Sequence, residues 1–355
     1  MDPLKSIKLK ILNYNILADS LLIDSLHLSE DEIEHISYLK WEYRLSKIME
    51  LIKKLSPDVI LFEEYENQTD FKNILKSNDY NYDILFKKRP GEHKEGCAIC
   101  FKKDLFKLEN FYFLEFRMHK KSFIYNKENV ALFVLLKSII SNNYYLIVCS
   151  HLLFNYGRGD IKLGQIYQII QSILLIKNTY KNYDITVIFG ADLNSSPKSA
   201  IYEYITSSQI DVEYVNKANL SGQKNKYYKT KASNFDLNSE WYEEIISTRV
   251  KISQHELILT KERNNKISKE LIIKNDIPLE SVYHQKNNKE PDFTSCSRSF
   301  QGTFDFIFYN SNLELKINYV LEVPKIDGIN FSIIPSEENP SDHFPLFVEF
   351  EINYK

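Results

Sequence analysis

Short apolar runs separated by polar turns make up much of this chain, and their lengths are those of β-strands. Apolar and polar residues alternate from Ile7 to Leu17, which predicts a half-buried strand. The apolar run at 58–62 shows no alternation and indicates a strand covered on both faces. Further strands are expected at 129–137, 144–153, 184–194 and 302–310, with a last strand after His343.

Two stretches carry apolar residues at helical spacing. They are residues 41–55, which Pro57 ends, and residues 160–178, for which Asp160 is the expected N-cap. Helices and strands do not alternate regularly, and several neighbouring strands have the pattern of antiparallel pairs. We therefore predict an α+β fold of two packed, mainly antiparallel β-sheets flanked by helices.

Residues from about 213 to 290 differ in composition from the rest of the chain. They are rich in Lys, Asn and Ser and lose periodicity, which favours an insertion with loops. The runs on both sides of this stretch fit one core. We expect a single catalytic domain over residues 1–355.

Composition narrows the function classes. The formal net charge is −3, so a generally basic nucleic-acid binder is excluded, and a polyanionic substrate would need a local basic patch or metal ions. No apolar run approaches the ~18 residues of a membrane helix, so no membrane association is expected. Cys97 and Cys100 have no second cysteine pair for a zinc site, and four cysteines favour a reduced compartment, the cytoplasm, with the nucleus also open.

Polar side chains gather where the apolar runs end. Each of seven lies at or within a residue or two of such a boundary: Asn15, Glu64, His151, Asp192, Asn194, Asp305 and His343. Any of them alone has an ordinary alternative, such as a strand-end turn for Asn15 or a hydrogen-bonded strand residue for His151. Together, strand ends from two packed sheets can bring them to one edge.

Oxygen ligands with a few imidazoles suit a hard cation, Mg²⁺ or, as a substitute, Mn²⁺. Such an ion neutralises phosphate charge and promotes in-line attack on phosphorus. An Asp–His pair fixes the histidine tautomer and supports proton transfer. The pattern therefore predicts a metal-dependent phosphoesterase.

Seven stretches carry a resemblance to a known family. They are "LNYNILAD", "WEYRLSKIMELIKKLSPDVILFEEYE", "KRPGEHKEGCAICFK", "SHLLFNYGRGDIKLGQ", "GADLNSSPKSAIYEYI", "FQGTFDFIFYN" and "NPSDHFPL". The chain resembles the endonuclease/exonuclease/phosphatase superfamily, and within it the carbon catabolite repressor deadenylases and their Angel relatives. The resemblance implies the four-layer α/β sandwich of pancreatic deoxyribonuclease.

The resemblance also implies roles for the strand-end residues. Metal ligands would be Asn15, Glu64, Asp192 and Asp342, and catalytic residues would be His151, Asp192, Asn194, Asp305 and His343. Glu63 stands where relatives usually have Gln, which leaves the register of the two glutamates open by one residue. His343 is expected to face Asp305 and the phosphate.

Three further residues are candidate substrate contacts. Phe300 matches an aromatic that stacks on a terminal base in the deadenylases, Tyr156 replaces a family proline, and Arg158 is a candidate phosphate contact. Phe300 can equally be a core aromatic and Arg158 a surface charge. Tyr156 puts adenine preference in doubt.

The expected function is a Mg²⁺-dependent 3′–5′ exoribonuclease on RNA 3′ ends, plausibly a poly(A) deadenylase that releases nucleoside 5′-monophosphates. The alternative is an Angel-like phosphatase that acts on RNA-end 2′,3′-cyclic phosphate, and a non-catalytic scaffold is a third possibility. The chain has no leucine-rich repeats, so recruitment to a larger complex by that route is not expected.

Overall fold

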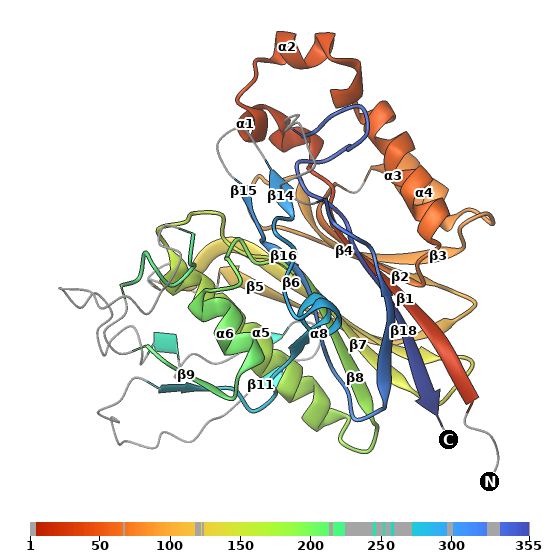
Figure 1. The fold of residues 1–355 in the computed structure, drawn as a ribbon, viewed down its shortest axis with the longest axis vertical. Coiled ribbons are helices and arrows are strands. Elements are labelled where there is room, and N and C mark those ends of the chain that lie inside the picture. The colour runs from red at the N-terminus through yellow and green to blue at the C-terminus, as the bar shows by residue number, and fades with distance from the viewer. Residues whose placement is uncertain are drawn as a thin grey trace.

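Two six-stranded β-sheets pack face to face, and helices cover their outer faces (Figure 1). The computed structural model describes residues 5–66, 68–117, 122, 124–212, 216–223, 244–245, 251–252, 257–258, 272–296, 301–324 and 334–354. Each sheet contains one parallel pair of strands and is otherwise antiparallel. The predicted class, two mainly antiparallel sheets flanked by helices, is confirmed.

The first sheet runs, in spatial order, β17 (Leu315–Val320), β18 (Leu346–Tyr354), β1 (Lys5–Asn15), β2 (Val59–Glu66), β4 (Glu95–Lys102) and β3 (Tyr82–Lys88). The second runs β13 (Glu280–Ser281), β16 (Asp305–Asn310), β8 (Ile185–Asp192), β7 (Tyr144–His151), β6 (Asn126–Ser138) and β5 (Phe106–Arg117).

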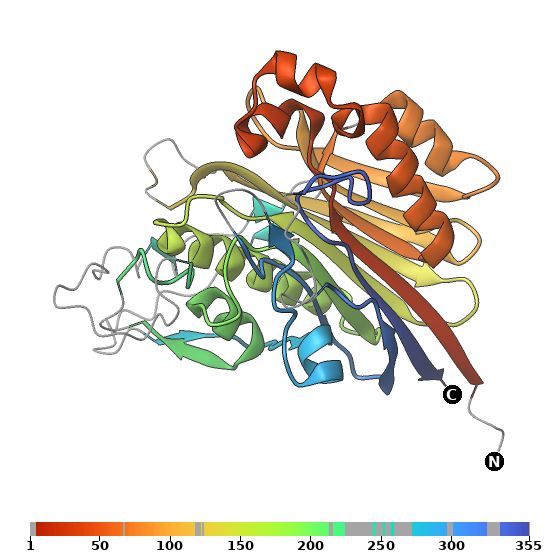
Figure 2. The same ribbon diagram turned by 45° about the horizontal axis from the view of Figure 1, so that its top comes forward.

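Four layers result from these sheets and their helices. The first sheet is covered by α3 (Trp41–Leu55) and α4 (Thr69–Lys76), and the second by α5 (Gly159–Thr179) and α6 (Ala200–Thr206), as both views show (Figure 2). Strand alternation explains the layers. In β1, Leu9 and Ile11 enter the core between the sheets, whereas Leu12 and Tyr14 pack on the α3 side.

Shorter elements surround the two sheets. The helices are α1 (Leu22–Leu26), α2 (Glu30–His35) and α8 (Val282–Asn287), and the strand pairs are β9 (Gln209–Asp211) with β12 (Ile272–Lys274), β14 (Ser295–Cys296) with β15 (Gln301–Gly302), and β10 (Lys251–Ile252) with β11 (Leu257–Ile258). None of the helices among the described residues has the length and apolar character needed to span a bilayer.

The topology brings strand ends together. β1 and β2 are parallel and joined through α3, and β7 and β8 are parallel and joined through α5. The carboxyl ends of each pair therefore meet at one edge of the sandwich. The antiparallel β16 starts at this edge with Asp305 beside Asp192. The opposite edge holds both chain ends, where Lys5 pairs with Tyr354 (Figure 1).

Two details differ from the sequence expectation. The predicted N-cap Asp160 is the second residue of α5 instead, because its carboxylate accepts two hydrogen bonds from Arg158, each of 3.0 Å, and Arg158 occupies the cap. Part of the expected insertion belongs to the core. Ile273, Val282 and Tyr283 are buried, and β13 pairs with β16, so the core resumes at about 272 rather than 290.

Cys97 and Cys100 lie on opposite faces of β4. Cys97 belongs to the core between the sheets, and Cys100 to the core under α3 and α4. All four cysteines are free and buried. Side chains alternate between the two faces of a strand, so residues three positions apart point to opposite faces. The two thiols are therefore on opposite sides of the sheet and cannot bind one zinc ion together.

Candidate active site

The predicted polar side chains meet at the edge where the parallel strands end. Asn15 closes β1, Glu64 lies near the end of β2, His151 closes β7 and Asp192 closes β8. The backbone register aligns Asn15 with Glu63, and His151 with Asp192. Residues far apart in the sequence are therefore neighbours because the sheets are built this way.

A β-bulge settles which of the two glutamates enters the site. The pairing of β2 with β4 shifts between Phe62 and Tyr65, and Glu64 has a φ of 55°, in the left-handed region. Its carboxylate accepts hydrogen bonds from the Asn15 side-chain amide at 3.0 Å and from the Ala18 backbone N–H at 3.0 Å. Glu64 is thus the glutamate of the site.

Glu63 lies beneath the site, between the sheets. Its side chain is fully buried, and one carboxyl oxygen accepts a hydrogen bond from the Cys149 thiol at 3.6 Å. Burial raises the pKa of Glu63 well above 4.5, and nearby acidic groups add to the rise. A neutral Glu63 presents one O–H donor and a carbonyl acceptor, so it resembles a neutral glutamine amide except for one missing N–H donor.

Asp192 is the hub of the cluster. Its Oδ2 accepts a hydrogen bond from the Asn15 amide at 3.2 Å, and lies 3.5 Å from His151 Nε2 and 3.8 Å from His343 Nε2. Its Oδ1 accepts from the Asn194 backbone N–H at 2.9 Å. Asn194 also contacts His151 Nε2 with its side-chain amide at 2.9 Å. Two histidines, one at the end of β7 and one in the loop before β18, thereby face one carboxylate.

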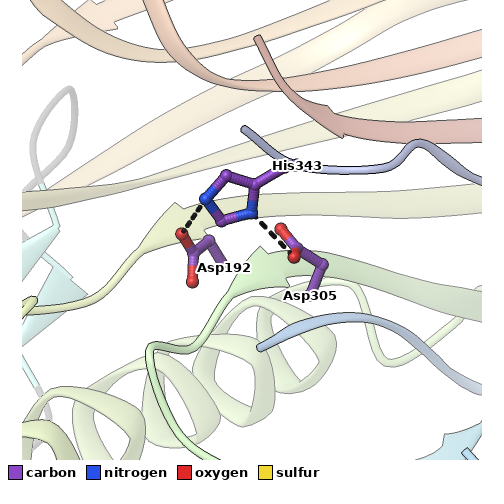
Figure 3. A group of neighbouring side chains, drawn as sticks. All are labelled: Asp192, Asp305 and His343. Atoms are coloured by element: carbon purple, nitrogen blue, oxygen red, sulfur yellow. Dashed lines mark hydrogen bonds and ion pairs between the residues drawn. The ribbon is translucent and has the colours of Figure 1, made fainter. Parts of the chain in front are cut away.

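His343 lies between Asp192 and Asp305, as Figure 3 shows. Its Nδ1 is 2.8 Å from Asp305 Oδ2, so the predicted pairing with Asp305 is confirmed. Burial alone would lower the pKa of His343, but the charge and hydrogen bond of Asp305 raise it well above 6.5, with smaller contributions from Asp342 and Asp192. Nε2 of the resulting imidazolium faces the carboxylates of Asp192 and Asp342.

Asp342 completes the ring of acids. Its Oδ1 lies 4.0 Å from His343 Nε2, and its Oδ2 accepts a hydrogen bond of 2.6 Å from Ser25 in α1. Burial raises the pKa of Glu64, the charge of His151 opposes this rise, and the charge of Asp342 adds to it. Glu64 and Asp342 therefore repel one another across the site.

This donor set fits a hard divalent cation. Glu64, Asp342 and Asp192 supply carboxylate oxygens and Asn15 supplies an amide, and a cation among them would relieve the repulsion of the acids. Asp192, Asp305 and His343 also offer ligand atoms within 4.8 Å of one another. Asp305 and His343 already bind each other, which favours the first set as the residues that would hold the ion.

The candidate substrate residues are less uniformly placed. Tyr156 is 54% exposed in the loop after β7, where it is available to a ligand. Arg158 is engaged by Asp160, whose side chain is only 1% exposed, so a substrate phosphate would compete with an internal partner. Phe300 lies outside the described residues. The roles of these three residues stay predictions.

Several supporting residues carry no signal in the sequence. Thr294 donates its hydroxyl proton to Asp305 Oδ2, and Ser341 donates to the Asn15 carbonyl at 2.7 Å. Asn129 donates to the His151 carbonyl at 3.1 Å and accepts from Gln165. Serines, threonines and amides are common on any chain, so only their position in the fold marks them.

The chain is similar in sequence to known proteins. A family model described as Endonuclease/Exonuclease/phosphatase family matches residues 12–343. Carbon catabolite repressor protein 4 homolog 3 of Arabidopsis thaliana is 32% identical over 359 residues, which cover 96% of this chain and 74% of that protein. Protein angel homolog 2 of Homo sapiens is 26% identical over 382 residues, which cover 96% of this chain and 69% of that protein.

Solved structures agree with the sequence comparisons. ANGEL2, described as a 2′,3′-cyclic phosphatase, superposes with a TM-score of 0.76 at 26% identity over 98% of this chain and 95% of that chain. The human Nocturnin catalytic domain superposes with a TM-score of 0.61 at 20% identity over 98% of this chain and 97% of that chain, which supports the fold. From its first strand to His343, the chain thus belongs to the endonuclease/exonuclease/phosphatase family.

Proposed function

We propose that the protein is a divalent-metal-dependent phosphodiesterase that acts at the 3′ ends of RNA. The observation that carries the proposal is the convergence of Glu64, Asp342 and Asp192 with an imidazolium, His343, held by a buried carboxylate. Carboxylates that can bind a cation, with two imidazoles close to one of them, suit a negatively charged phosphate ester.

Each residue of the site has a separate role in the proposed reaction. A bound divalent cation would neutralise phosphate charge and favour attack by hydroxide. Asp192 and Asn194 orient the attacking water, and Asp192 accepts its proton. His151 and His343 donate hydrogen bonds to phosphate oxygens as negative charge develops, and Asp305 keeps His343 protonated for that task.

Two reactions use this chemistry, and the comparisons favour different ones. In the first, water opens a terminal 2′,3′-cyclic phosphate, a P–O bond to one ribose oxygen breaks, and a phosphomonoester remains. We place it first because ANGEL2 aligns with almost the whole chain. In the second, water cleaves the last phosphodiester and releases a nucleoside 5′-monophosphate, as the sequence led us to expect, with poly(A) as the proposed tail. The 32% identity to a carbon catabolite repressor homologue supports it.

A gel assay with 5′-labelled RNA separates the two reactions. The purified protein is incubated with 20-mers that end either in 2′,3′-cyclic phosphate or in A, U or C tails with a free 3′ hydroxyl, in Mg²⁺, in Mn²⁺ or in EDTA. Cyclic-phosphate opening leaves the chain length unchanged and makes the terminal phosphate removable by a phosphomonoesterase. Exonuclease activity gives a ladder that shortens from the 3′ end.

Glu64→Ala should abolish either reaction while the protein remains folded, because it removes a carboxylate that would hold the cation. Glu50→Ala, on the exposed face of α3, is the matched control and should leave the rate unchanged. Retained turnover in purified, folded Glu64→Ala protein would overturn the site assignment. A wild-type protein that processes neither RNA with either metal would overturn the proposed function. The cytoplasmic location stays a prediction.

A further inference from the structure

A buried lysine, Lys162 on α5, lies behind the site and has no role in the chemistry described above. Its side chain is completely buried. The ammonium donates to the Phe154 carbonyl at 3.4 Å, to the Gln223 side-chain carbonyl at 2.8 Å and to the Asn194 backbone carbonyl. A single nitrogen thus joins the loop after β7, the loop after β8 and the turn at 216–223.

The acceptors around this nitrogen match the three donors of an ammonium group. Its three acceptors are neutral oxygens, and an ammonium has three N–H groups to match them, whereas an amine has two. Burial lowers the pKa of Lys162 to about 7, and the charge of Asp192 opposes this fall. A buried cation of this kind is costly, which argues for a use beyond simple packing.

The acceptor that matters most is Asn194. Its φ is 46°, in the left-handed region, which asparagine adopts more readily than other non-glycine residues. In this conformation the Asn194 backbone N–H reaches Asp192, while its side-chain amide reaches His151 Nε2 and the Leu152 carbonyl at 3.1 Å. The hydrogen bond from Lys162 to the Asn194 carbonyl helps to hold the backbone in this conformation.

The turn at 216–223 is fixed to the same two loops by independent contacts. Ser221 donates its hydroxyl proton to the Tyr156 carbonyl at 3.0 Å, and its own carbonyl accepts from the Ser196 N–H at 2.9 Å. Gly159 packs so closely on this turn that a Cβ there would lie 2.6 Å from Leu220 Cβ. Lys162 therefore sits at the centre of a rigid junction and not in a loose surface contact.

We infer that Lys162 is a positioning residue for the phosphodiester reaction, which acts by holding Asn194 in the conformation that orients His151 and Asp192. The inference rests on the proposed function for its kinetic readout. Lys162 touches no reacting atom in this role. Its loss should lower kcat and leave substrate affinity largely intact.

A double-mutant cycle between Lys162→Met and Asn194→Ala tests the inference. Methionine keeps the length of the side chain and removes every donor. We expect Lys162→Met to lower kcat by about tenfold or more with KM changed by less than about threefold, which is the pattern of a lost transition-state interaction. In the Asn194→Ala background, the same change should lower kcat by clearly less than in the wild type, because the side-chain contact with His151 is already lost and only the backbone contact with Asp192 remains to be disturbed.

A matched control comes from the same helix. Lys177 is half-buried near the end of α5 and donates to the Ile185 carbonyl at 3.2 Å, far along the strands from Asn194. Lys177→Met should lower the melting temperature and leave kcat unchanged. If Lys162→Met retains wild-type kcat, or if its effect multiplies fully with that of Asn194→Ala, the inference is overturned.

Two further measurements keep the test decisive. If Lys162→Met does not fold, Gln223→Leu takes its place, because it removes one acceptor of the Lys162 ammonium. It should lower kcat by about two- to fivefold, and its effect should also be non-additive with that of Asn194→Ala. Purely additive effects would count against the inference. Crystal structures give a readout without turnover. Asn194 should leave its positive φ in the Lys162→Met protein, and an unchanged Asn194 would contradict the inference even if the proposed reaction proves wrong.

Discussion

Arg44→Met should uncouple two loops of the site and destabilise the fold. Arg44 is a fully buried residue of α3, and its Nη1 donates to the carbonyls of Ile16 at 3.0 Å, Leu17 at 2.7 Å and Pro340 at 3.2 Å. The first two carbonyls follow Asn15, and the third lies two residues before Asp342. One guanidinium therefore ties the loop after β1 to the loop that carries Asp342 and His343.

The contacts set the size of the effect. A hydrogen bond to a charged donor contributes about 1.5–3 kcal/mol, and an unsatisfied buried carbonyl costs about 1–3 kcal/mol. Removal of the cation offsets part of this loss, because burial lowers the pKa of Arg44 and so disfavours its charged form, while Asp19 at 3.4 Å opposes that effect. Methionine retains most of the packing volume. We expect a net loss of about 3–5 kcal/mol in the free energy of unfolding.

Urea unfolding at 25 °C in the absence of metal measures this loss. Lys47→Met is the matched control, because Lys47 lies one turn further along α3 in a surface ion pair with Glu50. It should change the unfolding free energy by less than about 0.5 kcal/mol. In Arg44→Met protein that still folds, the Mg²⁺ concentration for half-maximal activity should rise about 10–100-fold, as for lost partners of metal ligands.

The reasoning fails on either of two results. A loss below about 1 kcal/mol would mean that the three carbonyls find water when the guanidinium is gone, so that Arg44 does not stabilise the loops. A large loss of stability with an unchanged Mg²⁺ requirement would mean that Arg44 supports the fold and not the geometry of the site.

Three other perturbations test the polar interior around the site. Asp305→Asn should lower the pKa of His343, and an unchanged value in an NMR titration would contradict the pairing. Because the pKa of His343 is raised in the folded state, the pairing stabilises the fold fully below about pH 6.5, and this stabilisation is lost as the pH rises through the folded-state pKa. Gly190→Ala places a Cβ 2.2 Å from Asn13 Oδ1 and should cost about 1–3 kcal/mol in urea unfolding, a loss that Asn13→Ala in the same protein should largely restore. The pKa of the buried Lys162 is about 7 in the folded state and about 10.5 in the unfolded state. Between these pH values the unfolding free energy of the wild type, relative to that of Lys162→Met, should therefore increase with pH, by at most about 5 kcal/mol. A difference in unfolding free energy that does not change with pH would rule out the lowered pKa.

The convergence of the polar side chains could be predicted from the sequence because the topology makes strand ends meet. Each of Asn15, His151, Asp192 and Asp305 lies at the boundary of an apolar run that can be seen in the sequence, and the parallel pairs with their helical crossovers bring those boundaries to one edge. The choice between Glu63 and Glu64 was left open, since it depends on a β-bulge that leaves no mark on residue types.

The supporting contacts were not predictable in the same way. Arg44 and Lys162 bind backbone carbonyls, and a carbonyl looks the same at every position of a sequence. The sequence contains one hint of these residues, a basic side chain on the otherwise apolar face of a helix. Arg44 stands four residues before the buried Ile48, and Lys162 four residues before the buried Ile166, each on the apolar face of its helix where a cation is unexpected.

These two cations explain how an acidic site stays free for a metal ion. Among the described residues, no Lys or Arg nitrogen lies within 4.0 Å of the carboxylates of Glu64, Asp192, Asp305 or Asp342; the basic side chains at that range are histidines. A direct Lys or Arg partner would occupy the oxygens that a cation needs. Arg44 and Lys162 instead act on the carboxylates through the field of buried charges and through the backbone, which holds the acids in place without covering them.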